Sequence, residues 1–148
     1  MSWKVASLAD EELQRAIVEY ELLRSELEAL ARQDELLRLS LEEHLRARET
    51  MKRYQEGGKG ADILVPIGAN SFLFAEIKHP DKAIVGLGSD ISIEDTMENA
   101  IKRLDRRIEE LSAAQNGTAK RMTETREKVR EKSTLVKELY EKGQTREK

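Results

Sequence analysis

The chain has 148 residues, of which 37% are charged, 4% are aromatic and none is cysteine. The lack of cysteine excludes a disulfide framework, a cysteine-ligated zinc site and a thiol nucleophile, and so much charge with so few aromatic residues is typical of long exposed helices. The sequence contains no run of about 18 apolar residues, the length needed to span a membrane. The N-terminus also lacks the apolar stretch of a signal peptide, so we expect a cytoplasmic protein.

The first predicted element is a long helix over residues 7–56. Ser7 and Asp10 fit a capping box at its start, and the glycines of residues 57–60 stop it. Apolar residues recur in alternating steps of three and four, which indicates a coiled coil. Nine of the twelve positions in this seam are apolar. The twelve positions are Leu13, Ala16, Tyr20, Leu23, Leu27, Leu30, Asp34, Leu37, Leu41, His44, Arg48 and Met51.

Residues 62–94 follow as a strand-rich segment, which we expect to form four short strands in two hairpins. Turns are predicted at residues 68–70, 79–82 and 88–90. The strands are apolar on both faces, and an isolated hairpin is barely stable in water. We therefore expect the hairpins to join hairpins of other subunits, through residues Ile63, Leu64, Val65, Pro66, Ile67, Phe72, Leu73, Phe74, Ile77, Ile84, Val85 and Leu87. The alternative is a monomer whose helices fold over the sheet.

A second long helix is predicted over residues 95–142, followed by a basic tail over residues 143–148. Asp95 and Thr96 cap its start, although Ser92 is a rival first residue. The same alternating step gives a seam of thirteen positions, of which nine are apolar. The thirteen positions are Met97, Ile101, Leu104, Ile108, Leu111, Gln115, Thr118, Met122, Thr125, Val129, Lys132, Val136 and Leu139. Asn116 and Gly117 form a turn dipeptide, so this helix either continues through a weak point or splits into two.

The two seams have similar lengths, so the helices can pair side by side in antiparallel order. This register brings Met51 close to Met97 and Leu13 close to Leu139. The expected fold class is α+β and mainly α, a long antiparallel two-helix coiled coil joined by two β-hairpins that form a β-barrel in an oligomer. We expect one domain over residues 1–148.

Catalysis is not expected. His44 falls in a helix seam and His79 in a turn, and neither has a triad or ligand partner at useful spacing. The glycines around Lys59 follow a helix rather than a strand, with no Ser or Thr after the lysine, so they are not a phosphate-binding loop. We therefore expect no enzyme activity, no cofactor and no metal site.

The hairpin segment resembles the prefoldin family, specifically its alpha-type subunits. Residues 64–72, Leu-Val-Pro-Ile-Gly-Ala-Asn-Ser-Phe, look like that family's first hairpin, and residues 85–88, Val-Gly-Leu-Gly, look like its glycine-bearing third strand. The resemblance extends over the whole chain in architecture, and two hairpins rather than one are typical of the alpha type.

The resemblance implies a hexamer of two alpha-type and four beta-type subunits joined through a double β-barrel. Coiled-coil tips would hold unfolded proteins and deliver them to a group II chaperonin without ATP. The client-binding residues would be the apolar ones near the helix ends, some on the seam and some beside it: Leu8, Leu13, Ile17, Val18, Leu22, Val136, Leu139 and Tyr140.

Two other functions remain open at this stage. A structural or scaffolding coiled coil, such as a filament-forming prefoldin paralogue, would self-associate through the hairpins. A nucleic-acid-binding protein would use residues 118–148, which carry ten Lys or Arg against six Asp or Glu. These charges alternate in sign, as on a solvated helix face, and Tyr140 is the only aromatic residue among them, so we expect no nucleic-acid partner and no membrane partner.

Overall fold

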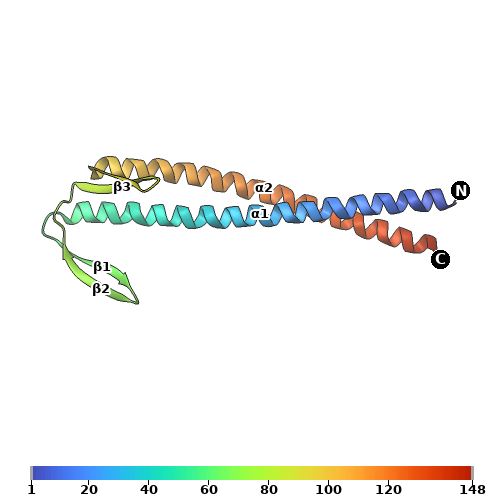
Figure 1. The fold of residues 1–148 in the computed structure, drawn as a ribbon, viewed down its shortest axis with the longest axis horizontal. Helices are drawn as coiled ribbons and strands as arrows, with labels where there is room; N and C mark the ends of the chain where they lie inside the picture. The colour runs from blue at the N-terminus through green and yellow to red at the C-terminus, as the bar shows by residue number, and fades with distance from the viewer. Residues whose placement is uncertain (1, 148) are drawn as a thin grey trace. The chain divides into compact units, whose positions relative to one another are not determined.

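The computed structural model describes residues 2–147, with side chains from Leu8 to Thr145. In chain order the elements are α1 (Ser2–Gly57), β1 (Asp62–Gly68), β2 (Ser71–Glu76), β3 (Lys82–Gly88), β4 (Ile91–Thr96) and α2 (Met97–Glu147) (Figure 1). This confirms a mainly α protein with two long helices and two hairpins. The chain divides into two compact units. Residues up to 38 and from 114 form the terminal unit, and residues 39–113 form the hairpin unit.

The terminal unit is a pair of antiparallel helix segments. Ala16 and Leu30 of α1 are buried, each 3% exposed. Thr118 and Thr125 of α2 are also buried. All four occupy seam positions predicted from the heptad pattern. Ion pairs cross between the helices, from Lys132 to Glu19 and from Arg121 to Glu26, the latter at 3.5 Å. As the partner on α1 moves forward along the chain, the partner on α2 moves back, so the pairing is antiparallel as predicted.

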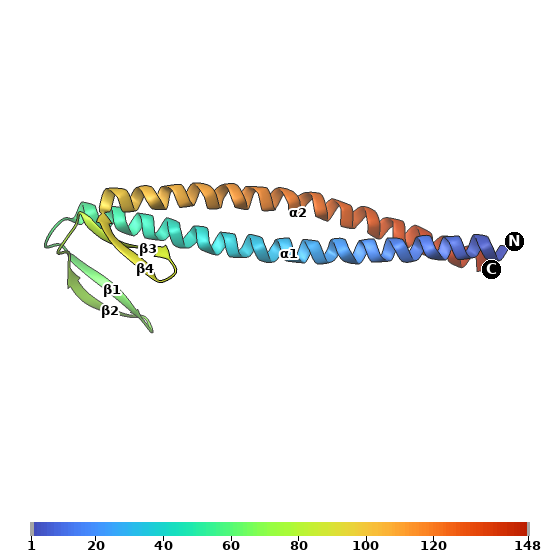
Figure 2. The same cartoon turned by 45° about the horizontal axis from the view of Figure 1, so that its top comes forward.

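The hairpin unit contains the adjoining parts of both helices and all four strands (Figure 2). Met97, Ala100 and Leu111 of α2 are buried in it. Arg48 of α1 forms an ion pair with Asp105 of α2, which shows that the helices are also paired here.

The strands form two separate two-stranded antiparallel sheets, β1 with β2 and β3 with β4. Each hairpin has the same construction. The register shifts by one residue just before the turn, between Pro66 and Gly68 in the first hairpin and between Gly86 and Gly88 in the second. Within the described residues neither sheet closes into a barrel, because each has only two strands.

Both turns use backbone conformations that suit their residues. Ala69 and Asn70 have positive φ angles of 50° and 55°, and Ser89 and Asp90 have φ angles of 52° and 61°. Two consecutive residues with positive φ make the tight turn that matches the twist of a hairpin. Asn and Asp tolerate this left-handed region better than other non-glycine residues. These angles confirm the turns predicted at residues 68–70 and 88–90.

Backbone hydrogen bonds join the end of the first hairpin to the short loop between α1 and β1. Gly60 donates its N–H to the carbonyl oxygen of Ile77 at 2.8 Å, and Ile77 donates to the carbonyl oxygen of Ala61 at 2.9 Å. The Ile77 side chain is 2% exposed, and its Cδ1 atom lies 3.3 Å from where a Cβ on Gly57 would stand. A glycine at residue 57 therefore makes room for the isoleucine that closes this corner.

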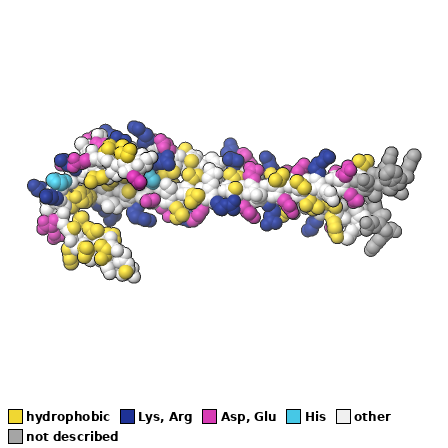
Figure 3. Space-filling view, viewed as in Figure 1, with side chains coloured by type: hydrophobic (Ala, Val, Ile, Leu, Met, Phe, Trp, Pro, Cys, Tyr) yellow, Lys and Arg dark blue, Asp and Glu magenta, His cyan; other side chains and the backbone are white. Residues whose placement is uncertain are grey.

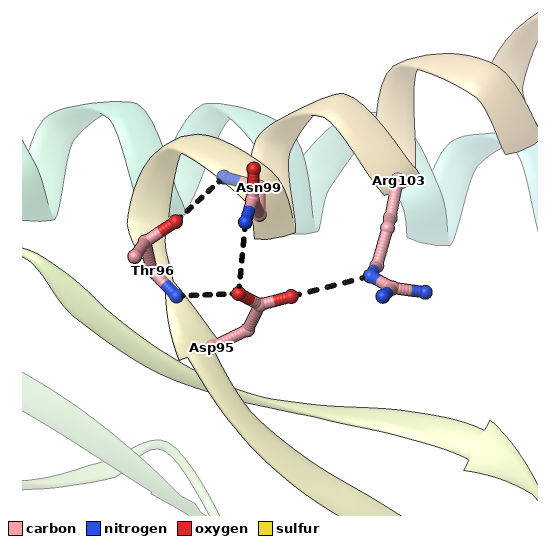
Figure 4. Close-up of polar contacts among 4 residues, drawn as sticks. All are labelled: Asp95, Thr96, Asn99 and Arg103. Atoms are coloured by element: carbon pink, nitrogen blue, oxygen red, sulfur yellow. Dashed lines mark hydrogen bonds and ion pairs between the residues drawn. The ribbon is translucent and has the colours of Figure 1, made fainter.

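The start of α2 is capped as predicted, by Thr96 (Figure 4). The hydroxyl oxygen of Thr96 accepts a hydrogen bond from the backbone N–H of Asn99 at 3.1 Å. Asp95 Oδ1 accepts two more, from the Thr96 N–H at 2.8 Å and from Asn99 Nδ2 at 3.1 Å. On its other oxygen, Asp95 pairs with Arg103 at 3.4 Å. The rival start at Ser92 is wrong, because Ser92 lies inside β4.

Three boundaries differ from the prediction. Helix α1 already begins at Ser2, so Ser7 and Asp10 lie inside the helix rather than at its start. The strand segment extends to Thr96 rather than to residue 94. Helix α2 runs to Glu147, so the basic tail predicted over residues 143–148 is helical as far as it is described, and Lys148 lies outside the described residues.

The end of α2 is held by contacts between successive turns. Gln144 Nε2 donates to the Tyr140 hydroxyl at 2.8 Å, and the Thr145 hydroxyl donates to the carbonyl oxygen of Glu141 at 2.8 Å. The helix also passes without a break through Asn116 and Gly117, which confirms the continuous alternative.

Candidate functional site

The two hairpins expose many large apolar side chains to solvent. Phe74 is 89% exposed and Ile84 75% exposed, and Figure 3 shows the first hairpin covered by hydrophobic side chains in yellow. The other exposed residues among those predicted for assembly are Leu64, Val65, Pro66, Ile67, Phe72, Leu73 and Leu87. Because contiguous exposed apolar patches mark interaction sites, this surface is suited to contact with another protein.

Three of the predicted assembly residues are placed differently. Ile63 and Val85 are half-buried. Ile77 is buried inside its own chain, so its assignment to an exposed assembly surface needs correction. Ile77 follows the last residue of β2, where the chain returns to the end of α1. The alternation of side chains along the strand did not predict that Ile77 is buried there. Ile91, 58% exposed, joins the exposed set instead; its alternation with polar neighbours in β4 was the available signal.

An apolar groove of about 300 Å³ lies between α1 and α2 in the terminal unit. Its walls combine aliphatic and aromatic side chains from both helices with one lysine and one serine: Leu13, Ile17, Tyr20, Ser133, Val136, Lys137 and Tyr140. The Tyr20 ring also carries the Arg24 guanidinium 5.8 Å from its centroid. A groove of this composition can take an apolar side chain, and its lysine can pair with an acidic group.

The groove brings together four of the eight residues predicted to bind clients, namely Leu13, Ile17, Val136 and Tyr140. The other four lie outside it. Leu8, Val18 and Leu22 are 65%, 57% and 66% exposed, whereas Leu139 is half-buried. Sequence reasoning placed Tyr20 only in the seam and did not select Ser133 or Lys137. The available signal was spacing, because each lies three residues, about one helical turn, from a selected residue on the same helix.

A second groove, of about 530 Å³, lies in the hairpin unit between β3 and both helices. His44, Met51 and Leu104 line it, together with Arg106 and the backbone of Gly86. His44 Nδ1 lies 2.7 Å from the carbonyl oxygen of Ser40, a contact within its own helix, and His79 does not line the groove. The groove brings no nucleophile together with a histidine base.

Two carboxylates have lowered pKa values. Hydrogen bonds from Asn99 and from the backbone of Thr96, with a smaller contribution from Arg103, lower the pKa of Asp95 from its ordinary value. The hydrogen bond and charge of Lys132 lower the pKa of Glu19. In both cases the contacts stabilise the charged carboxylate, and both groups serve helix capping or helix pairing rather than proton transfer.

Neither a metal site nor a membrane span is found in the part of the chain that the structure describes. No group of three or more His, Asp or Glu side chains is arranged to hold a metal ion there. No helix in that part is long and apolar enough to cross a bilayer.

Two long antiparallel helix segments and two hairpins with exposed apolar faces define a two-helix coiled-coil protein with a separate strand segment. Comparison with known proteins agrees. The prefoldin subunit family matches residues 23–142. Prefoldin subunit alpha of Pyrococcus horikoshii is 33% identical over 136 residues, covering 90% of each chain. Prefoldin subunit alpha of Methanosarcina acetivorans is 34% identical over 105 residues, covering 69% of this chain and 74% of that one.

A solved structure is also similar. The chain of a filamentous PFD from Methanocaldococcus jannaschii, determined by cryo-EM, is 27% identical, with 82% of this chain and 95% of that chain covered and a TM-score of 0.49. On the sequence matches, the chain belongs to the prefoldin family and is an alpha-type subunit. Prefoldins are chaperones, and family membership supports a chaperone-type role rather than an enzymatic one.

Proposed function

We propose that this chain is the alpha-type subunit of an ATP-independent holdase chaperone that works in the cytoplasm. Its hairpins join beta-type subunits in a hexamer of two alpha and four beta chains. Its terminal unit holds unfolded proteins and delivers them to a group II chaperonin. The single observation that carries the client-binding part is the apolar groove between α1 and α2, which Leu13, Ile17, Tyr20, Val136 and Tyr140 line.

The groove suits clients without a defined structure. It is open, and the side chains of Ile17 and Tyr140 remain 38% and 55% exposed. An apolar side chain of an unfolded segment can therefore reach it without entering a closed pocket. One such contact is weak, but several terminal units in one assembly raise the effective affinity for a single long client.

The hairpins support the assembly part of the proposal. Phe74 and Ile84 expose more than half of their surface, although burial of such a side chain stabilises by about 1.5–3 kcal/mol. Each two-stranded sheet also leaves strand edges that can pair with further strands. Contact with neighbouring hairpins would remove both features from water together.

Aggregation suppression tests the client-binding part. The assembled complex, without nucleotide, is mixed with a chemically unfolded test protein, and light scattering is followed. The double variant Ile17→Ser and Tyr140→Ser is expected to lose most of the suppression, because both side chains border the groove. Leu45→Ser is the matched control, since Leu45 is 43% exposed but lies in the hairpin unit. Equal suppression by both variants would refute client binding at the groove.

Mass measurement tests the assembly part. The chain is measured alone and after mixing with beta-type subunits. A discrete hexamer that forms only on mixing supports the proposal, and Phe74→Ser with Ile84→Ser is expected to prevent it. Long polymers from the chain alone would favour the scaffolding alternative. Transfer of a labelled client from the complex to a group II chaperonin tests delivery, and a client that stays bound to the complex would contradict it.

A further inference from the structure

The face of α1 that points away from the α2 seam carries exposed leucines in the terminal unit. Leu22 and Leu36 are 66% and 69% exposed, and Val18 is 57% exposed. None of these residues lines the groove described above. Leu22, Ala29 and Leu36 follow one another at seven-residue intervals, so they lie in one row along the helix.

A row of glutamates runs beside these apolar residues. Glu21, Glu28 and Glu35 also lie seven residues apart, each directly before a member of the apolar row, and all three are exposed. Glu35 pairs with Arg38 on the same helix at 2.6 Å. In the described part of the chain Glu21 and Glu28 have no ion-pair or hydrogen-bond partner. Figure 3 shows hydrophobic, acidic and basic side chains next to one another along the helices.

The glutamates on the seam side behave differently. Glu19 and Glu26 pair with Lys132 and Arg121 of α2, and so their charges serve the helix pair. The charges of Glu21 and Glu28 have no such use within the terminal unit. We call the set of Val18, Glu21, Leu22, Glu28 and Leu36 the outer α1 face. Arg32, four residues after Glu28 and four before Leu36, is also exposed on this face, so the glutamates outnumber the basic residues there without being the only charges.

We propose that the outer α1 face docks a basic amphipathic helix of a protein partner. A helix laid along α1 meets one apolar position about every 10.5 Å, the rise of seven residues. Lysines or arginines beside its own apolar row would then face Glu21 and Glu28. Recognition of an apolar helix face by a matching row of side chains is a common mode of binding, and the acidic row sets the sign of the partner's charge.

A second copy of this chain is a poorer match for the same surface. Two outer α1 faces placed together would bring like charges opposite each other. In the described part of α2, the only large hydrophobic side chain that is highly exposed is Tyr140, so α2 offers no apolar row. An unfolded client is a poorer match too, because it has no fixed spacing to meet positions seven residues apart. Docking at the outer α1 face is therefore a separate interaction from the client binding proposed above.

The probe for this proposal is a synthetic helical peptide with leucines at heptad spacing and lysines on both sides of them. A matched peptide replaces every lysine with glutamate. Both are labelled, and binding to the assembled complex is followed by fluorescence anisotropy. The lysine peptide is expected to bind at least about tenfold more tightly than the glutamate peptide, and raising the salt concentration should reduce the difference.

Variants of the complex locate the binding. Leu22→Ser with Leu36→Ser is expected to weaken binding of the lysine peptide at least about tenfold, since two leucines lose their burial. Glu21→Lys with Glu28→Lys should weaken it by about threefold or more. Both leave the seam intact, and circular dichroism checks the fold. The controls are Leu45→Ser and Ile17→Ser, which lie outside the outer α1 face and should bind as the unmodified chain does.

Three results would overturn the proposal. They are equal binding of the two peptides, variants of the outer α1 face that bind the lysine peptide as tightly as the controls do, and no binding of the lysine peptide up to about 1 mM. Suppression of aggregation is expected to be unchanged in the variant Glu21→Lys with Glu28→Lys. Failure of this proposal is therefore distinguishable from failure of the chaperone proposal, which depends on Ile17 and Tyr140.

Discussion

Two leucines on the same helix allow a sharp test of the helix pairing. Leu30 is 3% exposed and Leu36 is 69% exposed, although both lie on α1 in the terminal unit. Replacing Leu30 by Ala removes the burial of its side chain, worth about 1.5–3 kcal/mol, and leaves a gap in the seam. Losses of about 2–5 kcal/mol are usual for such changes. In a layer of only two helices the neighbours can move in, so we expect about 2–3 kcal/mol.

The matched variant Leu36→Ala should change the free energy of unfolding by less than about 0.5 kcal/mol. For a chain of this size, about 2–3 kcal/mol corresponds to a fall in Tm of about 4–12 °C. The assay is thermal and urea unfolding of the assembled protein by circular dichroism, with all variants at one protein concentration because association contributes to stability. Equal losses at Leu30 and Leu36 would show that the seam is not where the structure places it.

Three further predictions concern single residues. Asp95 has a pKa below its ordinary value of 3.8, so its stabilising contribution is complete above that pH and is lost as pH falls through the folded-state pKa. The variant Asp95→Asn should therefore lose less of its free energy of unfolding below pH 3.8 than the unmodified chain does, and an unchanged pH dependence would contradict this. Asn70→Val should cost about 1–2 kcal/mol in urea unfolding, because a β-branched residue resists a φ of 55°, whereas Asn70→Gly should not. Gly117→Ala should raise the free energy of unfolding by about 0.5–1 kcal/mol, since the helix is continuous there and nothing lies within 4 Å of the added Cβ; a lower Tm would argue against a regular helix.

Much of the fold could be read from periodicity. A seven-residue repeat forces the same side of a helix toward its partner at every turn, so the burial of Leu30, Thr118 and Thr125 follows from sequence positions alone. Turn residues act locally too. Asn70 and Asp90 take the left-handed conformations that their short polar side chains permit, and Thr96 caps α2 because its hydroxyl reaches the N–H of Asn99.

The sequence by itself therefore determined the two paired helices, their antiparallel order, the two hairpins and the apolar character of their faces. Only the tertiary structure decided which apolar residues remain in water. It buried Ile77 against the end of α1 and left Phe74 exposed, although the two lie close together in the chain. It also brought Tyr20 and Lys137 into one groove with Ile17 and Tyr140. The physical reason is range, because periodicity and turn chemistry act over a few neighbouring residues, whereas burial depends on which distant segments meet.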